Sequence, residues 1–191
     1  MTNIFFIHGA WSSRNSFNYF TSRLNYNKTY CFEYDPFKQT IPEIIDEAKK
    51  EMPENSIVVG HSLGGLIALS LHDESRCSKI VTLASPFSGI AIEPLVQNFV
   101  YSRVPVLKHL SPYASYISSL KEKEYTKPIW CYITVSGFHP LMTERNDGVV
   151  TLQSQKDWTP PDAAIKFLNL NHYEILQSSE VYHLLEGLLE C

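Results

Sequence analysis

The chain has 191 residues, a length typical of one folded domain. Hydrophobic residues make up 44% of the sequence and charged residues 19%, a balance that excludes extensive disorder. The net charge of −4 gives no overall attraction to nucleic acid, and the sequence has no local basic patch that would supply one. We therefore expect a single domain over 1–191 that does not bind nucleic acid.

No apolar run approaches the ~20 residues that cross a bilayer. The N-terminal apolar stretch is too short for a signal peptide and lacks the basic residues that precede one, so we expect a cytoplasmic protein without a transmembrane segment. The four cysteines are scattered and form no metal-ligand spacing. Because nucleotide-binding glycine motifs are also absent, no metal and no cofactor are expected.

Short apolar runs alternate with helical periodicities along the chain. The runs predict six strands: Ile4–Ile7, Tyr30–Tyr34, Ser56–Val59, Lys79–Ala84, Ile129–Val135 and Ile165–Leu170. Apolar residues at helical spacing predict helices around residues 17–24, 41–48, 63–71 and 181–188. Thr40 and Glu43 form a capping box before the second of these helices. Strands separated by helices imply a parallel sheet, whose ligands bind at the carboxyl ends of the strands.

Residues 86–128 interrupt this alternation because they are too long for a plain crossover. Apolar spacings predict one helix over 92–100 and a second over 110–120, with Ser111-Pro112 at its start. Both follow the fourth strand, so we expect them at the edge of the sheet where a site forms. We interpret the segment as a helical cap, and two packed helices without a gating role are the alternative.

The third strand is followed by Gly60-His61-Ser62-Leu63-Gly64-Gly65, a G-x-S-x-G sequence between a predicted strand and a predicted helix. Such a turn strains the serine backbone and presents its hydroxyl at the edge of the sheet. The N-terminus of the helix favours negative charge there, and the Leu63 amide is placed to bind an oxyanion. Ser62 is therefore the predicted nucleophile, and a purely structural glycine-rich turn is the alternative.

A serine hydroxyl needs a base, and a histidine base needs an acid that orients it. His172 directly follows the sixth strand and is the predicted base, with His139 in reserve. Asp147 is the predicted acid, because it lies between Ser62 and His172 in the chain order typical of this kind of sheet. The alternative acids are Asp157, Asp162 and, less favoured, Glu144.

The loop after the first strand, His8-Gly9-Ala10-Trp11, ends at the same edge of the sheet. We expect the Ala10 amide to be the second oxyanion donor and the His8 ring to hold the backbone of this loop. Trp11 and Phe87 are candidates for lining a substrate pocket, and a position in the core is the alternative for each.

Together these segments resemble the α/β-hydrolase superfamily, in particular small bacterial lipases and esterases of near-minimal size. The resemblance rests on residues 7–11, 60–65, 82–89, 146–150 and 171–173. It implies a three-layer α/β fold with about six parallel strands, helices on both faces and a helical cap insertion. It also implies nucleophile Ser62, acid Asp147, base His172 and oxyanion amides of Ala10 and Leu63.

The expected activity is hydrolysis of a carboxylic ester through an acyl-enzyme. The modest negative charge favours a small soluble ester over an anionic membrane lipid as substrate. A thioesterase, amidase or acyltransferase with the same three residues remains an alternative. A binding protein of the same fold with an idle site is a further one.

Overall fold

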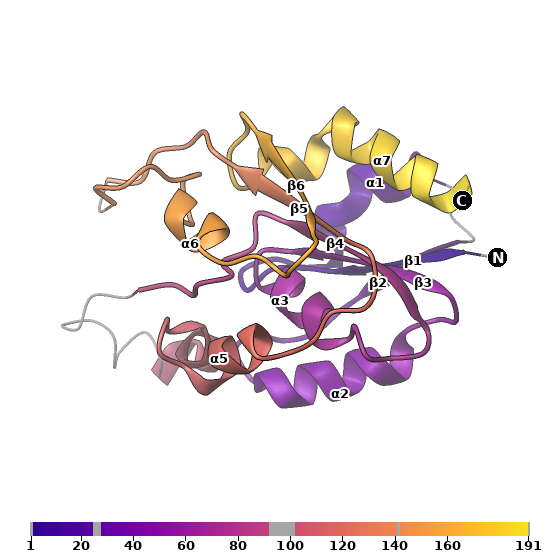
Figure 1. Cartoon of the computed structure of the whole chain (residues 1–191), viewed down its shortest axis with the longest axis horizontal. Helices are drawn as coiled ribbons and strands as arrows, with labels where there is room; N and C mark the ends of the chain where they lie inside the picture. The colour runs from indigo at the N-terminus through magenta and orange to yellow at the C-terminus, as the bar shows by residue number, and fades with distance from the viewer. Residues whose placement is uncertain (1, 25–27, 92–101, 141, 191) are drawn as a thin grey trace.

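A computed structural model describes residues 2–24, 28–91, 102–140 and 142–190. Six parallel strands form one sheet in the order β2-β1-β3-β4-β5-β6 (Figure 1). The strands are β1 (Asn3–Ile7), β2 (Thr29–Phe32), β3 (Ser56–His61), β4 (Cys77–Leu83), β5 (Ile129–Thr134) and β6 (Ala164–Leu168). Since all strands run the same way, the loops after β1, β3, β5 and β6 meet at one edge of the sheet.

Helices cover both faces of the sheet (Figure 1). One layer holds α2 (Ile41–Glu51), α3 (Leu63–Ser70) and α5 (Ser115–Lys121), and the other holds α1 (Asn18–Thr21) and α7 (Ser179–Glu190). Side chains of β1 alternate between the two layers, because Phe5 and Ile7 join one core cluster and Ile4 and Phe6 the other. This arrangement confirms the predicted three-layer α/β fold.

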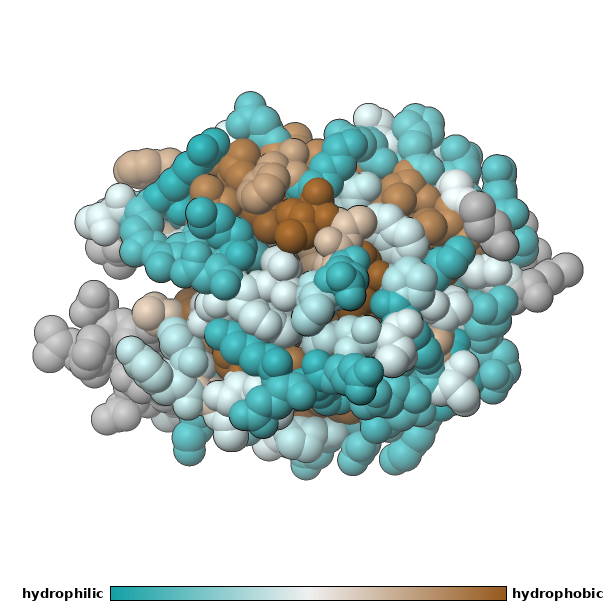
Figure 2. Space-filling view, in the orientation of Figure 1, coloured by the Kyte–Doolittle hydropathy of each residue, from teal (hydrophilic) through white to brown (hydrophobic). Residues whose placement is uncertain are grey.

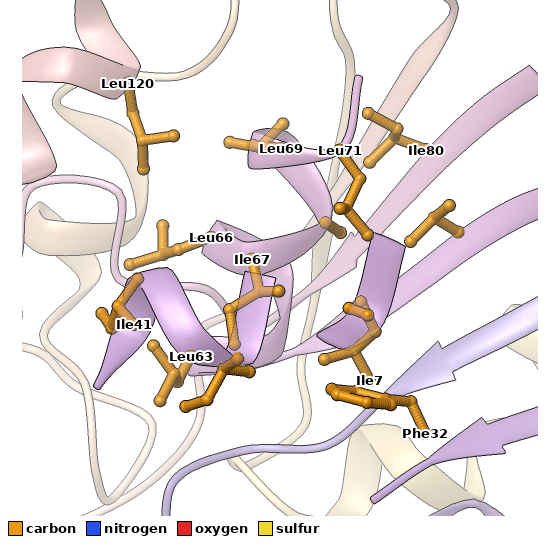
Figure 3. Packing of buried hydrophobic residues seen from close by; sticks show 14 of the residues in the cluster. Ile7, Phe32, Ile41, Leu63, Leu66, Ile67, Leu69, Leu71, Ile80 and Leu120 are labelled. Atoms are coloured by element: carbon orange, nitrogen blue, oxygen red, sulfur yellow. The ribbon is translucent and has the colours of Figure 1, made fainter. Parts of the chain in front are cut away.

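The helix α3 lies at the centre of one layer, and all eight of its residues are buried. Figure 3 shows its leucine and isoleucine side chains gathered with Ile7, Ile41, Ile80 and Leu120 from the neighbouring elements. A helix that is hydrophobic on every side is stable only when it is enclosed by other elements. The sheet, α2 and α5 provide that enclosure, and they fix the position of the residue that precedes α3.

In α2 the predicted capping box is present, because the Thr40 N–H donates to the Glu43 carboxylate at 2.7 Å. Other helices depart from their predicted boundaries. The helix expected after the first strand is short and is preceded by the 3₁₀ turn η1 (Arg14–Phe17). The short elements that were not predicted include α6 (Leu152–Lys156) and the 3₁₀ turn η4 (Glu174–Gln177).

The predicted cap segment is described only in part. The helix expected over 92–100 lies outside the described residues. The 3₁₀ turn η3 (Pro105–Leu110) precedes α5, which begins at Ser115 and not at Ser111. Ile117 and Leu120 of α5 are buried in the core cluster that surrounds α3. The described helix therefore packs as part of a layer, and the cap role of 86–128 stays a prediction.

One face of the edge strand β6 is not covered by a helix. Ile165 and Phe167 pair in register with Cys131 and Ile133 of β5, yet their side chains are 47% and 55% exposed. Figure 2 shows hydrophobic surface over β5 and β6 on the side that faces the viewer.

Within the described ranges, no helix has the length and apolarity that a bilayer span requires.

Candidate active site

Ser62 lies between β3 and α3 with φ 55° and ψ −122°, a left-handed conformation that is rare for a residue with a side chain. Its N–H donates to the Leu83 carbonyl at the end of β4, at 2.8 Å. Buried packing on both sides of the turn holds this strained backbone in place. The predicted strand–serine–helix turn therefore has the geometry that exposes a nucleophile at the edge of a sheet.

Glycines around Ser62 allow the turn to approach the sheet. A Cβ at Gly64 would overlap the Ile7 carbonyl oxygen of β1 and lie 2.6 Å from that of His8. A Cβ at Gly60 would in turn overlap the backbone of Gly64. The helix and the strand consequently sit closer together than any larger residue permits.

Asp147 and His172 form a direct pair at the same edge. The Nδ1–H of His172 donates to Oδ2 of Asp147 at 2.8 Å, and both side chains are almost completely buried. Burial by itself raises the pKa of the Asp147 carboxyl, but bonds from His172, Thr134 and the Val150 N–H outweigh it and lower the pKa. Asp147 is therefore held ionised, and the bond at Nδ1 leaves the other ring nitrogen, Nε2, with its lone pair in the neutral imidazole.

The backbone of His172 is also fixed on two sides. Its N–H donates to the Asp147 carbonyl at 2.9 Å, and its own carbonyl accepts from Nε2 of His61 at 2.8 Å. The rings of His61 and His172 lie 4.7 Å apart. His61, the residue before Ser62, thus connects the serine turn to the histidine loop.

Ser62 and His172 line one small pocket together with Ala10 and Trp11. Its volume is about 20 Å³, which is enough for one water molecule by the usual requirement of roughly 10–15 Å³. Leu63 buries its side chain in the core, and its N–H is one of those at the start of α3 that have no acceptor within the helix. The structure therefore brings the predicted nucleophile, base and loop after β1 to one place.

The loop after β1 is held by His8, as expected. Nδ1 of His8 donates to the Gly9 carbonyl at 2.8 Å, and the Tyr34 hydroxyl donates to the His8 carbonyl at 2.8 Å. The His8 ring stacks on Tyr34 with centroids 4.1 Å apart, and Nε2 lies 3.2 Å from the Glu33 carboxylate. Burial lowers the pKa of His8, so its ring supports the loop as a neutral group.

A larger cavity of about 440 Å³ adjoins the small pocket, and Val149 lines both. This volume falls in the range of small-molecule sites, roughly 300–1,000 Å³. The residues after β4, the loop around Asp147 and α6 contribute its walls, which include Glu144 and Asp157. Two of the alternative acids therefore line this cavity, whereas Asp147 alone among the candidate acids is bonded to His172.

The two predicted pocket residues differ in their placement. Trp11 lines the small pocket and is 55% exposed. Phe87 is 1% exposed and packs edge-on against Trp158, with ring centroids 6.1 Å apart. The structure thus places Phe87 in the core, the alternative left open for it, and it lines neither pocket.

Two residues that contact Asp147 were not predicted from the sequence. Thr134 ends β5 and Gln155 lies on α6, and both side chains reach the carboxylate. The available signal was weak, since Thr134 is a polar residue at the end of an apolar strand and α6 was not predicted at all.

These features define a parallel α/β protein with a serine at a strained strand–helix turn and a histidine–carboxylate pair at the same edge of the sheet. The chain belongs to the alpha/beta hydrolase family, whose model matches residues 4–173.

The chain is also similar to individual characterised proteins. The pimeloyl-[acyl-carrier protein] methyl ester esterase of Vibrio atlanticus is 39% identical over 69 residues, which cover 35% of this chain and only 27% of that protein. Phospholipase PlaB from Legionella pneumophila superposes on 100% of the chain with a TM-score of 0.73 and 15% identity, and the chain spans 62% of its length. A lipase from Bacillus licheniformis gives a TM-score of 0.69 and 15% identity, with 98% of this chain and 91% of the lipase covered. At these identities the structural likenesses establish the fold.

Proposed function

We propose that the protein is a serine hydrolase that cleaves carboxylic esters, with Ser62 as nucleophile, His172 as base and Asp147 as acid. The observation that carries this proposal is the buried Asp147–His172 hydrogen bond of 2.8 Å beside the pocket that Ser62 also lines. Membership of the hydrolase family and the similarity to an esterase support the same chemistry.

In the first half of the reaction, Nε2 of His172 takes the hydroxyl proton of Ser62 as Oγ attacks the ester carbonyl carbon. The carbonyl electron pair moves onto oxygen, and the amides of Ala10 and Leu63 donate hydrogen bonds to the resulting oxyanion. The intermediate then expels the alcohol, which receives the proton from His172. Asp147 stays ionised throughout and stabilises the imidazolium.

In the second half, His172 takes a proton from a water molecule that attacks the acyl-enzyme. The second tetrahedral intermediate releases the carboxylic acid and returns the proton to Ser62. The neutral imidazole is needed at the start of each half of the reaction.

The test combines a covalent probe with an ester panel. We expect a fluorophosphonate to label the wild type and p-nitrophenyl acetate and butyrate to be hydrolysed. Ser62→Ala should abolish labelling and lower kcat at least about ten-thousand-fold, because the nucleophile is lost. Ser22→Ala, at an exposed serine that directly follows α1, is the matched control and should retain both labelling and hydrolysis.

Two outcomes would contradict the proposal. A wild type that resists the probe and hydrolyses nothing would be an idle member of the fold. A wild type that is labelled at Ser62 but turns over only thioesters or anilides would carry out a different acyl transfer with the same residues.

A further inference from the structure

The Asp147 carboxylate accepts five hydrogen bonds from the described residues, and His172 supplies only one of them. Oδ1 accepts from the N–H groups of Val149 and Val150, at 3.0 and 2.7 Å. Oδ2 accepts from His172 at 2.8 Å, from the Thr134 hydroxyl at 2.5 Å and from the Gln155 amide at 3.1 Å. The oxygen that faces the histidine is therefore shared among three donors.

The orientation of the Gln155 amide is fixed by its partners. Oε1 accepts from the Thr134 N–H at 3.0 Å, and Nε2 donates to the Thr134 carbonyl at 3.1 Å and to Oδ2 of Asp147 at 3.1 Å. Both hydrogens of the amide nitrogen are used, and a flipped amide would place two acceptors against each other. Gln155 thus pairs with both backbone polar groups of Thr134, the last residue of β5, and connects them to the Asp147 carboxylate.

Thr134 and Gln155 are both 0% exposed. Hydrogen bonds to an ionised group in a buried site are strong, and they restrict the carboxylate to one rotation. They also draw negative charge away from the side of Oδ2 that stabilises a protonated His172. Their effect on the histidine is therefore distinct from that of a residue that merely fills space.

We propose that Thr134 and Gln155 are positioning residues of the site, which hold the Asp147 carboxylate in one orientation and share its charge in competition with His172. The hydrogen bonds carry the claim that Asp147 is held in place, and the expected effect on activity rests on the proposed function. Neither residue touches the substrate in this scheme, since both act through Asp147.

The competition between Thr134 and His172 for Oδ2 of Asp147 predicts the direction of a pH effect. Removing the Thr134 hydroxyl leaves more of the Oδ2 charge for His172, so the ring keeps its proton to higher pH. Among the described residues, two other titratable groups have rings that face His172. One is His61 at the end of β3, which is held neutral, and the other is Tyr173, the next residue in the chain, whose ring centroid lies 5.3 Å from that of His172. Both stay unchanged in the variants, so a shift reports the altered carboxylate.

The experiment compares Thr134→Val and Thr134→Ser in two measurements. The first is the acid limb of the kcat/KM profile with p-nitrophenyl butyrate, and the second is the NMR titration of the His172 ring without substrate. In Thr134→Val we expect both midpoints to move up by about half a pH unit or more, and kcat to fall roughly tenfold. Thr134→Ser keeps the hydroxyl and should return both midpoints to those of the wild type.

Gln155→Met tests the same shift in a second variant that leaves Thr134 intact. Lys156→Met makes the same replacement at the exposed neighbouring residue of α6, and Thr82→Val removes a hydroxyl from a buried threonine of β4. Both controls should leave the midpoints unchanged. Midpoints that do not move in folded Thr134→Val and Gln155→Met would show that the two residues only fill space, and would overturn the inference.

The two measurements separate this inference from the proposed function. A protein whose His172 titration shifts as expected but which hydrolyses no ester contradicts the function and retains the inference. A protein that hydrolyses esters with unshifted midpoints contradicts the inference alone.

Discussion

His61 shows how one buried side chain connects the site to the stability of the fold. It is 1% exposed, and burial together with the charge of His172 lowers its pKa to about 3. Nε2 holds the His172 carbonyl, while Nδ1 has no partner among the described residues. The sequence shows His61 only as the neighbour of Ser62, because the contact with His172 joins two residues that are 111 positions apart in the chain.

This pKa predicts an acid-dependent loss of stability. An unfolded histidine titrates near pH 6.5, so below that pH His61 is protonated in the unfolded chain and stays neutral in the folded protein. The contribution is fully present above pH 6.5 and falls by about 1.4 kcal/mol per pH unit as the pH drops toward 3. Urea unfolding between pH 6 and pH 4 should show that the free energy of unfolding of His61→Gln depends less steeply on pH than that of the wild type, by about this amount.

The matched control for that measurement is His183→Gln, at a histidine of α7 whose side chain is 71% exposed. It should leave the pH dependence of unfolding close to that of the wild type. If the free energy of unfolding depends equally on pH in the wild type and in His61→Gln, His61 is protonated in the folded protein as well, which would contradict its low pKa.

At the scale of elements, the close approach of α3 to β1 and β4 determines the serine turn. This strand–turn–helix unit is predictable from the sequence, because its glycines and its apolar run are contiguous in the chain. It did not predict α6, whose five residues carry no hydrophobic periodicity and whose buried Gln155 looks like a surface residue in the sequence. Such short elements are set by tertiary hydrogen bonds, which local patterns do not reveal.

A pair of glycine substitutions tests the packing of α3. Gly64→Ala should lower the free energy of unfolding by about 3 kcal/mol or more, because its Cβ would meet the backbone of β1. Gly187→Ala, in an open position of α7, should raise it by about 0.5–1 kcal/mol, as alanine favours a helix. If the two substitutions changed the free energy of unfolding equally, the close approach of α3 to β1 would be contradicted.

At the scale of the whole molecule, the sheet order places both cavities at one edge but leaves β6 partly uncovered. The sequence predicted six strands, yet it could not show that Ile165 and Phe167 would be exposed, because their pattern is that of a buried strand. Exposure follows from the position of β6 at the sheet edge and from the short α6, the only helix between β5 and β6 in the described residues.

The cavities predict a preference for substrate charge. The small pocket has room for the reacting group only, so the acyl chain needs a neighbouring cavity, and we expect it in the cavity of about 440 Å³ that shares Val149 with the pocket. The described lining of that cavity holds Glu144 and Asp157 but no lysine or arginine. A p-nitrophenyl ester whose acyl chain ends in a carboxylate should show kcat/KM about tenfold below that of a neutral ester of equal length.

The double variant Glu144→Gln with Asp157→Asn should remove most of this discrimination. Asp46→Asn, at an exposed position of α2, is the control for a change in net charge alone and should preserve it. If the anionic ester is preferred by the wild type, the acyl chain lies elsewhere.

The complete burial of α3 ties the geometry of Ser62 to the final stage of folding. The strained serine exists only when β1 and β4 have both closed around the helix, so a collapsed chain with loose packing presents an ordinary, unstrained serine. If Ser62 is the nucleophile that we propose, its covalent modification would count native molecules in a mixed population, and the time course of modification after dilution from denaturant would follow the completion of the core.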